Sequence, residues 1–502
     1  MLSTRPRFQA LVICLLAWIL APALAGASTD PTSRSLEGIL LFEWGDPDPE
    51  RGGLPIERAH LTQDDGRRIF LSLDPALLPG GTTQWHGRRV VVDPVVEGEK
   101  ALSTYGPGIA SPALPVAALR PAPGAAPAPR KMVTGSQPWI SLPCKFSDIA
   151  DEPRDLAFFQ GMYGNTAPGL DHFWREVSYD QIDIVGSTSV DWLVLPNPRS
   201  HYITLQNVNG NMVEVANLDL LFTECTGVAD PFVDFSNGGT GGFAGINLMF
   251  NAALDCCAWG GAGFKTLDGV AKVWRITWEP PFGYANAGVI AHEMGHGFGL
   301  PHANNSDGDA NPYDSPWDVM SWATGYSAID GTYGALGKHV NAYHKDRLGW
   351  IPAARLLDVP RDSVQTVTID HTVISSTSNY RMAKIAIPDT NDFYTVEVRK
   401  LRGSYESDLP GEGVIIHYVD PDRSEPSWVV DGEVPPADYS SNAGCRWIVG
   451  ETYADAANAI QIEVLSETTD GYTVRITNGS ADVIFSDGFE SGDVLQWSSS
   501  SP

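Results

Sequence analysis

The stretch GVIAHEMGHGFGLPH, residues 288–302, places three histidines and one glutamate within eleven positions, although the whole chain of 502 residues has only 11 histidines. These residues follow the pattern H-E-x-x-H-x-x-G-x-x-H, which is filled by His292, Glu293, His296, Gly299 and His302. Given how rarely these residues occur in the chain, chance would produce the pattern in roughly a few chains per hundred thousand. The spacing therefore indicates one site built by these side chains.

A helix over residues 285–298 would separate the stretch into two faces. At about 100° per residue, one arc of about 100° collects the apolar residues Ala287, Ile290, Ala291, Met294 and Phe298. His292 and His296 fall on the opposite side, one turn apart, so their imidazoles can reach one ion. Glu293 projects about 60–100° from them, too far round to be an easy ligand but near enough to touch water on a metal.

Two glycines, Gly297 and Gly299, let the chain stop and turn after this helix, because glycine accepts a positive φ. The turn brings His302 back as a third ligand. Zinc binds imidazole nitrogens at about 2.0–2.1 Å, and three protein ligands leave a fourth place for water, as in catalytic zinc sites. We therefore predict a Zn²⁺ site formed by His292, His296 and His302, with Glu293 as the general base. Two alternatives stay open: helix histidines that bind no metal, and structural zinc.

The motif, together with SPWDVMSW at residues 315–322, resembles the metzincin zinc endopeptidases. VNAYHKDRLGWI at residues 340–351 resembles the gametolysin family, as does the third histidine. FWREVSYDQIDIVGS (173–187) and the segment 393–420 are similar to gametolysins and to the related immune inhibitor A peptidases. The resemblance covers roughly residues 138–420 and implies a metzincin-like α+β catalytic domain, with a mixed sheet, an active-site helix and a Met-turn. Met320 would form the apolar floor of that turn beneath the metal.

Two features depart from that family pattern. Metzincins that use a tyrosine near the metal carry it two positions after the methionine, where this chain has Trp322, so no tyrosine is assigned as a transition-state stabiliser. Residues 28–143 contain no cysteine, which excludes latency through a cysteine thiolate. If the N-terminal region keeps the enzyme silent, it covers the cleft or places a carboxylate on zinc.

Four acidic residues lie in the loop between the last histidine and the methionine, namely Asp307, Asp309, Asp314 and Asp318. The pattern favours a solvated acidic loop whose carboxylates cap turns. A Ca²⁺ site is an alternative, because calcium takes 6–8 oxygen ligands from such loops. Some of these carboxylates could instead accept a hydrogen bond from the outer N–H of a zinc-bound histidine.

Residues 1–27 are predicted to be a signal peptide. Arg5 and Arg7 precede an apolar run, and small residues follow it, as at a signal cleavage site. The run is shorter than the ~20 residues of a membrane span, and no later segment is apolar enough to span. We therefore expect a secreted, extracellular protein with no integral membrane segment once the signal is removed. Periplasmic or cell-surface association is also compatible with this pattern.

The composition divides the rest of the chain. Residues 28–106 alternate strand-like runs with turn residues and predict an N-terminal β domain, which could be a proregion. Residues 107–132 are rich in proline and alanine and predict an extended linker. The zinc peptidase domain is expected over residues 133–352, a C-terminal β-sandwich-like domain over 353–478, and a polar tail over 479–502.

The net charge limits the classes of binding partner, and the cysteine content limits the possible disulfides. The formal net charge of −28 argues against nucleic acid as a partner. Five cysteines follow the signal, so at least one thiol lies outside any intramolecular pair, and export makes disulfides plausible. The adjacent Cys256 and Cys257 are expected to form disulfides with two different partners and not with each other.

These observations predict a secreted zinc-dependent endopeptidase whose partner is a protein or peptide substrate. The preference for an endopeptidase comes from the resemblance, because the motif alone indicates metal-assisted amide hydrolysis. The alternative is a catalytically idle, metzincin-like binding or adhesion protein of the cell surface or matrix. The oligomeric state stays open.

Overall fold

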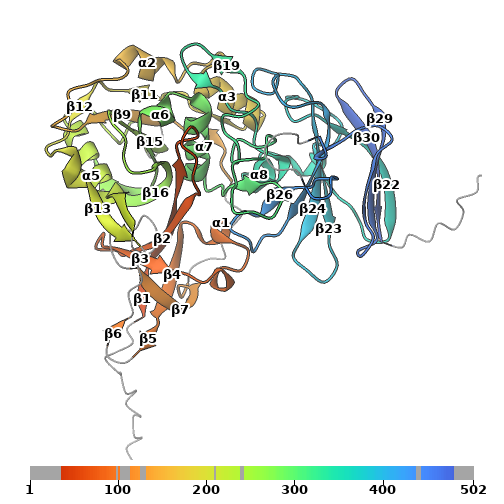
Figure 1. The fold of residues 1–502 in the computed structure, drawn as a ribbon, viewed down its shortest axis with the longest axis horizontal. Coiled ribbons are helices and arrows are strands. Elements are labelled where there is room, and N and C mark those ends of the chain that lie inside the picture. Colours follow the sequence, from red (N-terminus) through yellow and green to blue (C-terminus); the bar gives the residue numbers. More distant parts are fainter. Residues whose placement is uncertain are drawn as a thin grey trace, which may run out of the picture.

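The computed structural model describes residues 35–97, 100–101, 113–124, 132–208, 211–237, 242–436 and 443–479. The predicted signal peptide and all but the first residue of the predicted tail lie outside these ranges. Three parts lie side by side in Figure 1: a small barrel of N-terminal strands, a central body of helices and strands, and a C-terminal region of strands. The described chain is thus a mixture of helices and strands in which strands predominate.

The N-terminal part is a sheet of five strands that closes on itself. Its strands are β1 (Leu36–Pro47), β2 (Ile56–Thr62), β3 (Arg68–Ser72), β4 (Arg88–Pro94) and β7 (Leu114–Pro121). The order is β1-β2-β3-β7-β4, and β4 pairs back onto β1. Apolar side chains that include Leu40, Phe42, Leu61 and Val90 fill its core. Short elements complete it: η1 (Pro75–Leu77), α1 (Thr82–Trp85), β5 (Val96–Glu97) and β6 (Lys100–Ala101).

The region expected to be a linker contains one of these strands. β7 pairs antiparallel with β4, from Val90↔Pro121 to Pro94↔Val116. Proline and alanine content favoured an extended linker, but proline is tolerated near the end of a strand, where its missing N–H costs no ladder bond. The barrel therefore continues to about residue 121, beyond the expected boundary at 106.

The central sheet continues the barrel. Its main strands are β9 (Trp139–Lys145), β15 (Gly245–Phe250), β17 (Val270–Glu279) and β16 (Cys257–Leu267). The first three are parallel to one another, and β16 is antiparallel to β17. Every residue of β15 is buried, as expected for a parallel strand covered on both faces. The short strands β11 (Thr188–Ser189) and β12 (Leu193–Val194) pair with β9.

Helices cover this sheet. The longer ones are α3 (Leu170–Ser178), α5 (Leu218–Ala229) and α7 (Ala287–Phe298). The shorter ones are α2 (Leu156–Gly161), α4 (Arg199–Tyr202), α6 (Pro281–Tyr284) and α8 (Ala342–Arg347). The remaining strands are β8 (Gly135–Ser136), β10 (Ile182–Asp183), β13 (Ile203–Val208), β14 (Asn211–Ala216), β18 (Ala303–Asn304), β19 (Ile329–Asp330) and β20 (Gly334–Ala335). Two large apolar clusters hold the helices to the sheet.

Strand β1 belongs to both the barrel and the central sheet. Its second half pairs antiparallel with β16, from Glu43↔Gly261 to Pro47↔Cys257, so that barrel and central strands form one sheet of eleven. In Figure 1 the N-terminal strands rise from the barrel and run alongside α7. The N-terminal region is therefore docked on the central body and not merely tethered to it.

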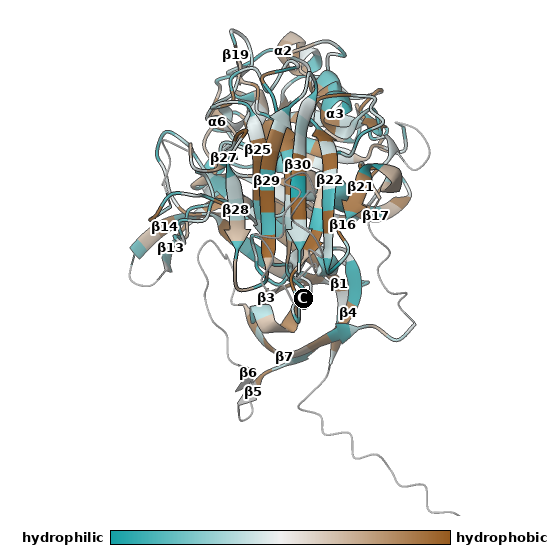
Figure 2. Ribbon diagram, turned by 90° about the vertical axis from the view of Figure 1, so that its right-hand side faces the viewer, coloured by the Kyte–Doolittle hydropathy of each residue, from teal (hydrophilic) through white to brown (hydrophobic). Residues whose placement is uncertain are grey.

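The C-terminal region consists of two packed sheets. One contains β21 (Leu356–Asp358), β23 (Met382–Ala386), β24 (Phe393–Arg399), β25 (Gly413–Val419), β26 (Ser427–Val429) and β27 (Arg446–Trp447), with β18 at its edge. The other contains β22 (Ser363–Asp370), β28 (Thr452–Asp455), β29 (Ile460–Glu467) and β30 (Gly471–Asn478), and Figure 2 shows it face-on. A shared apolar core joins the two sheets. The turn η2 (Ala353–Arg355) leads into this region.

Four cysteines form two disulfides. Cys144 of β9 is bonded to Cys225 of α5, and Cys256 is bonded to its neighbour Cys257. The expectation of two different partners for the adjacent pair was wrong. Cys144 and Cys225 are bonded to each other, so neither is a disulfide partner for the adjacent pair. Cys445 lies in the C-terminal region and forms no disulfide within the described residues. No helix among the described residues is both long and apolar enough to cross a membrane.

Candidate metal centre

Helix α7 carries the first two histidines and is buried along its whole length. It packs against β16 and β17, and all twelve of its residues are buried. The apolar arc expected from the sequence faces the central core, where Ile290, Met294 and Phe298 belong to one cluster. The opposite face, which carries His292 and His296, is covered by β1.

His292 and His296 point their Nε2 atoms at one another, 3.1 Å apart. The Nδ1 atom of His292 lies 2.7 Å from the carbonyl oxygen of Val319, and that of His296 lies 2.8 Å from the carbonyl oxygen of Leu300. Because a carbonyl only accepts, each Nδ1 carries a proton, and the neutral form of each ring presents a lone pair at Nε2. Burial lowers the pKa of His296 to about 3, which keeps this imidazole neutral.

His302 reaches the same point from the turn after the helix. The helix ends at Phe298, and Gly299 caps it with a φ of 93° in the left-handed region, as expected for a glycine stop. Gly297, the other glycine expected at the stop, lies inside the helix. The ring centroid of His302 lies 5.2 Å from that of His292 and 4.7 Å from that of His296. All three predicted ligands therefore meet in space.

A carboxylate that the sequence did not single out completes the group. Asp46, near the end of β1, places Oδ1 at 2.6 Å from His302 Nε2. Its Oδ2 lies 3.4 Å from Nε2 of both His292 and His296. Burial would raise the pKa of Asp46, but the neighbouring imidazoles of His302 and His292 hold it well below its usual range. The only hint in the sequence was that residues 28–143 contain no cysteine. A carboxylate on zinc was therefore one of the two expected ways in which the N-terminal region could block the site.

The four side chains fit a zinc ion. One ligand atom from each of Asp46, His292, His296 and His302 lies within 4.8 Å of all the others, and all four residues are buried. Tetrahedral coordination at about 2.0–2.1 Å would separate two nitrogens by about 3.3 Å, close to the 3.1 Å between the two helix histidines. Two aprotic nitrogens facing each other at that distance repel unless a cation lies between them. Three imidazoles and one carboxylate are also a donor set that zinc accepts.

Glu293 lies beside this group, beneath β16. A Cβ atom on Gly260 of β16 would come within 2.8 Å of Glu293 Oε2, so the missing side chain at Gly260 makes room for the carboxylate. Burial raises the pKa of Glu293 well above its usual value, and the nearby carboxylates of Asp46 and Glu279 raise it further. A buried carboxyl group whose pKa is raised in this way can take a proton and return it.

No protein-family model and no curated protein matches the chain. The interpretation of the centre therefore depends on its own geometry.

Met320, which the resemblance assigns to a Met-turn, lies in a turn that follows Asp318. Its backbone N–H donates to Asp318 Oδ1 at 2.7 Å, and its carbonyl accepts from the N–H of Ala303 at 3.0 Å. A Cβ on Gly295 would approach Met320 Sδ to 2.4 Å. The turn thus packs directly under α7, and its Val319 carbonyl orients His292.

The four acidic residues of the loop lie at two different positions in the structure. Asp307, Asp309 and Asp314 bring ligand atoms within 4.8 Å of one another, so Ca²⁺ stays a prediction for this group. Asp307 and Asp309 accept backbone N–H bonds, from Asp309 and Asn311 respectively, as expected for a turn-capping loop. Asp318 is buried and accepts from Met320 and Asn341 N–H and from His344 Nδ1. It therefore braces the Met-turn instead of contacting a metal-site histidine.

Tyr313 was also missed from the sequence. Its hydroxyl donates to Asp46 Oδ1 at 2.6 Å, and its ring packs edge-on against His302 with centroids 5.6 Å apart. The residue two positions after Met320 is Trp322, whereas this phenol enters from the loop before the turn. Only the folded loop brings the hydroxyl to the centre.

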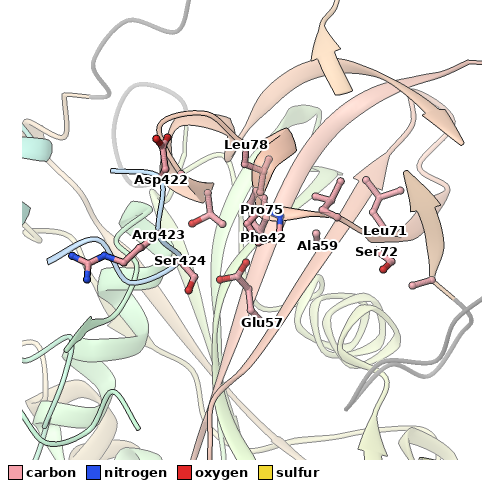
Figure 3. Close-up of a pocket in the computed structure, with 14 residues that line it drawn as sticks. Phe42, Glu57, Ala59, Leu71, Ser72, Pro75, Leu78, Asp422, Arg423 and Ser424 are labelled. Carbon is pink, nitrogen blue, oxygen red and sulfur yellow. The ribbon is translucent and has the colours of Figure 1, made fainter. Parts of the chain in front are cut away.

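A separate cavity of about 460 Å³ lies between the barrel and the C-terminal region. Figure 3 shows Asp422, Arg423 and Ser424 on one side and barrel residues such as Phe42 and Leu78 on the other. None of the three histidines lines it. It marks the interface along which the N-terminal barrel is docked.

Proposed function

We propose that the protein is a secreted zinc-dependent endopeptidase of the metzincin type. The observation that supports this most directly is the convergence of three buried imidazole Nε2 positions beside a buried glutamate of raised pKa. A structural zinc site would have no use for such a glutamate. The order of elements, with the glutamate helix, the glycine stop and the methionine turn packed beneath, supports the metzincin type.

His292, His296 and His302 would hold the ion through Nε2, with the backbone carbonyls on Nδ1 fixing the two helix rings. When bound, Zn²⁺ supplies a Lewis acid that polarises the peptide carbonyl and makes water acidic enough to attack near neutral pH. Glu293 accepts the proton of the attacking water and returns it to the leaving nitrogen. Its raised pKa suits both transfers.

The test uses the purified protein before and after limited trypsin treatment, quenched with a serine-protease inhibitor, in a casein hydrolysis assay. We expect the treated protein to cleave casein, to lose activity with 1,10-phenanthroline and to recover it with zinc. Glu293→Gln, treated in the same way, should keep its zinc by elemental analysis and show at least about a thousandfold less hydrolysis. Metal loss or near-normal activity in this variant would contradict the role of Glu293.

The rival function, a binding or adhesion protein, predicts a different result from the same samples. Such a protein would cleave no casein under any processing condition, and Glu293→Gln would bind matrix proteins as well as the unmodified chain does. No described feature favours it, because a binding protein does not need the glutamate that this chain retains beside its three histidines.

A further inference from the structure

Strand β1 lies where an extended peptide would pair with the central sheet. β16 is bonded to β17 on one side and to β1 on the other, so without β1 it would be an edge strand. An edge strand binds an extended peptide through backbone hydrogen bonds. Residues 43–47 make that pairing here, opposite residues 257–261 of β16.

The close fit of β1 extends to its side chains. The indole of Trp44 stacks on His296, with ring centroids 4.8 Å apart and an interplanar angle of 9°, and its Nε1 donates to Glu57 at 3.1 Å. Gly45 allows the strand to approach closely, because a Cβ there would come within 2.6 Å of the Trp259 ring. The next residue, Asp46, then reaches all three histidines.

We propose that Asp46 is a fourth protein ligand of the metal and that β1 thereby holds the intact chain as an inactive precursor. This inference rests on the proposed function, since it assigns the regulation of the same site. Asp46 takes the coordination place that water needs, and residues 43–47 occupy the strand position that an extended substrate needs. The coordination place and the strand position become free only when the barrel dissociates from the central body.

The barrel is held in this position by contacts away from the centre. Arg68 Nη1 pairs with Asp219 Oδ1 at 3.2 Å, and the N–H of Gly80 donates to Asp422 Oδ1 at 2.6 Å. Because β7 ends at Pro121 and belongs to the barrel, while β8 begins at Gly135 and belongs to the central body, a cut between these two residues would separate the barrel from the central body. The mature N-terminus would then lie in that interval.

The deciding experiment measures coordination in the full-length chain and does not require turnover. The chain is loaded with Co²⁺, and its visible spectrum is recorded with and without acetohydroxamate. Asp46→Ala and the isosteric Asp46→Asn are compared with Asp48→Ala, which removes a carboxylate two positions away that bonds only to its own turn.

We expect acetohydroxamate to leave the spectra of the unmodified chain and Asp48→Ala unchanged and to shift those of both Asp46 variants. Release of Co²⁺ to a chelator should be at least about tenfold faster in the Asp46 variants. Equal hydroxamate binding and equal release in all four proteins would overturn the inference. Failure of the proposed function looks different: Co²⁺ would then bind no better to the chain than to a His292→Ala, His296→Ala double variant.

Tyr313 also contacts Asp46 at this centre. The hydroxyl of Tyr313 lies 2.6 Å from Asp46 Oδ1, the oxygen that is also 2.6 Å from His302 Nε2. Any oxygen that replaces this one after the barrel leaves lies within hydrogen-bonding reach of the phenol. The ring of Tyr313 packs edge-on against His302, with centroids 5.6 Å apart, which holds the hydroxyl beside this position.

We infer that Tyr313 is a catalytic residue whose hydroxyl donates to the oxyanion of the tetrahedral intermediate. In the processed enzyme, Tyr313→Phe should lower kcat by about 10²–10³ with KM within about threefold, as for other oxyanion donors. Its affinity for a phosphinic peptide, which mimics that intermediate, should fall by a similar factor. Tyr333→Phe, which loses a hydrogen bond to the Phe158 carbonyl instead, should change neither. A rise in KM alone, or unchanged phosphinate affinity, would contradict the role.

Discussion

At the scale of single residues, the centre combines side chains that are close in the chain with one that is far away. His292 and His296 are neighbours by helix geometry, but Asp46 lies 256 positions from His302 and still contacts it at 2.6 Å. The three imidazoles direct their Nε2 atoms toward the carboxylate of Asp46, so nitrogen and oxygen donors meet at one point. Each of these residues is buried, so none of them can turn to solvent instead.

The third histidine provides a direct test of the ligand set. His302→Ala removes one nitrogen donor and leaves helix α7 unchanged, so we expect the zinc affinity of the full-length chain to fall at least about a hundredfold. Competition with a fluorescent chelator measures this affinity. His201→Ala, which alters an exposed histidine, should bind zinc like the unmodified chain, and equal affinity in both variants would remove His302 from the set.

Gly299 tests the turn that delivers this histidine. Its φ of 93° is disfavoured for any residue with a Cβ, so Gly299→Ala should lower the free energy of unfolding by about 1 kcal/mol or more. Urea unfolding followed by circular dichroism measures the change. The control is Gly227→Ala inside α5, where a Cβ meets nothing within 4 Å, and this variant should gain stability by about 0.5–1 kcal/mol.

At the scale of elements, β1 is the decisive strand. Its first half closes the barrel through β4 and its second half extends the central sheet through β16. Strand pairing requires a partner that presents matching backbone groups, and β16 presents them along residues 257–261. Docking of the barrel therefore depends on the same backbone ladder that we assign to the substrate.

Gly45 permits this docking because it has no side chain between β1 and the Trp259 ring. Gly45→Ala would place a Cβ against the rigid Trp259 ring, so β1 should pair less closely with β16. We expect trypsin to remove the N-terminal region of this variant at least about fivefold faster, because local opening becomes more frequent. Gel electrophoresis over a time course measures the rate. Gly331→Ala, with nothing near its Cβ, should be cut at the original rate.

At the scale of the whole molecule, buried charges join the central and C-terminal parts. Arg399 of β24 donates to Glu397 Oε1 at 2.7 Å and to the carbonyl of Trp317, next to the Met-turn, at 2.7 Å, and it also pairs with Glu406. Because all these groups are buried, the C-terminal sandwich helps to hold the turn under helix α7. The segment that packs beneath the metal centre thus depends on a second domain.

Removing that guanidinium should destabilise the protein strongly. Arg399→Leu leaves two buried carboxylates without their cation, and we expect the free energy of unfolding to fall by about 3–5 kcal/mol. Urea unfolding measures this loss. Arg402→Leu, at an exposed side chain in the same region, should change stability by less than about 0.5 kcal/mol, and a similar loss in both variants would contradict the structural role of Arg399.

A buried lysine makes stability depend on pH. Burial lowers the pKa of Lys338 to about 7, whereas the unfolded chain keeps the ordinary value near 10.4. Between these values the unfolded state binds more protons, so the free energy of unfolding rises with pH by up to about 1.4 kcal/mol per unit. Lys338→Met should reduce this slope between pH 7.5 and 9.5 in urea titrations. An unchanged slope would show that Lys338 stays charged in the folded protein.

The sequence by itself determined the features that depend on local periodicity. The apolar arc and the histidine spacing predicted helix α7, its glycine stop and the meeting of three imidazoles, because helix geometry relates residues three and four apart. The strands of the C-terminal region followed from runs rich in β-branched and aromatic residues, as in VQTVTID and GVIIHYV. These signals lie within windows of a few residues.

Only the tertiary structure decided what closes the centre. Asp46 and Tyr313 stand in segments with no motif, and a strand ladder between residues 43–47 and 257–261 leaves no mark in either segment alone. The same holds for β7 in the proline-rich stretch and for the bond between Cys256 and Cys257. Backbone pairing is nearly independent of side-chain identity, so a single sequence shows which segments can be strands but not which strands become partners.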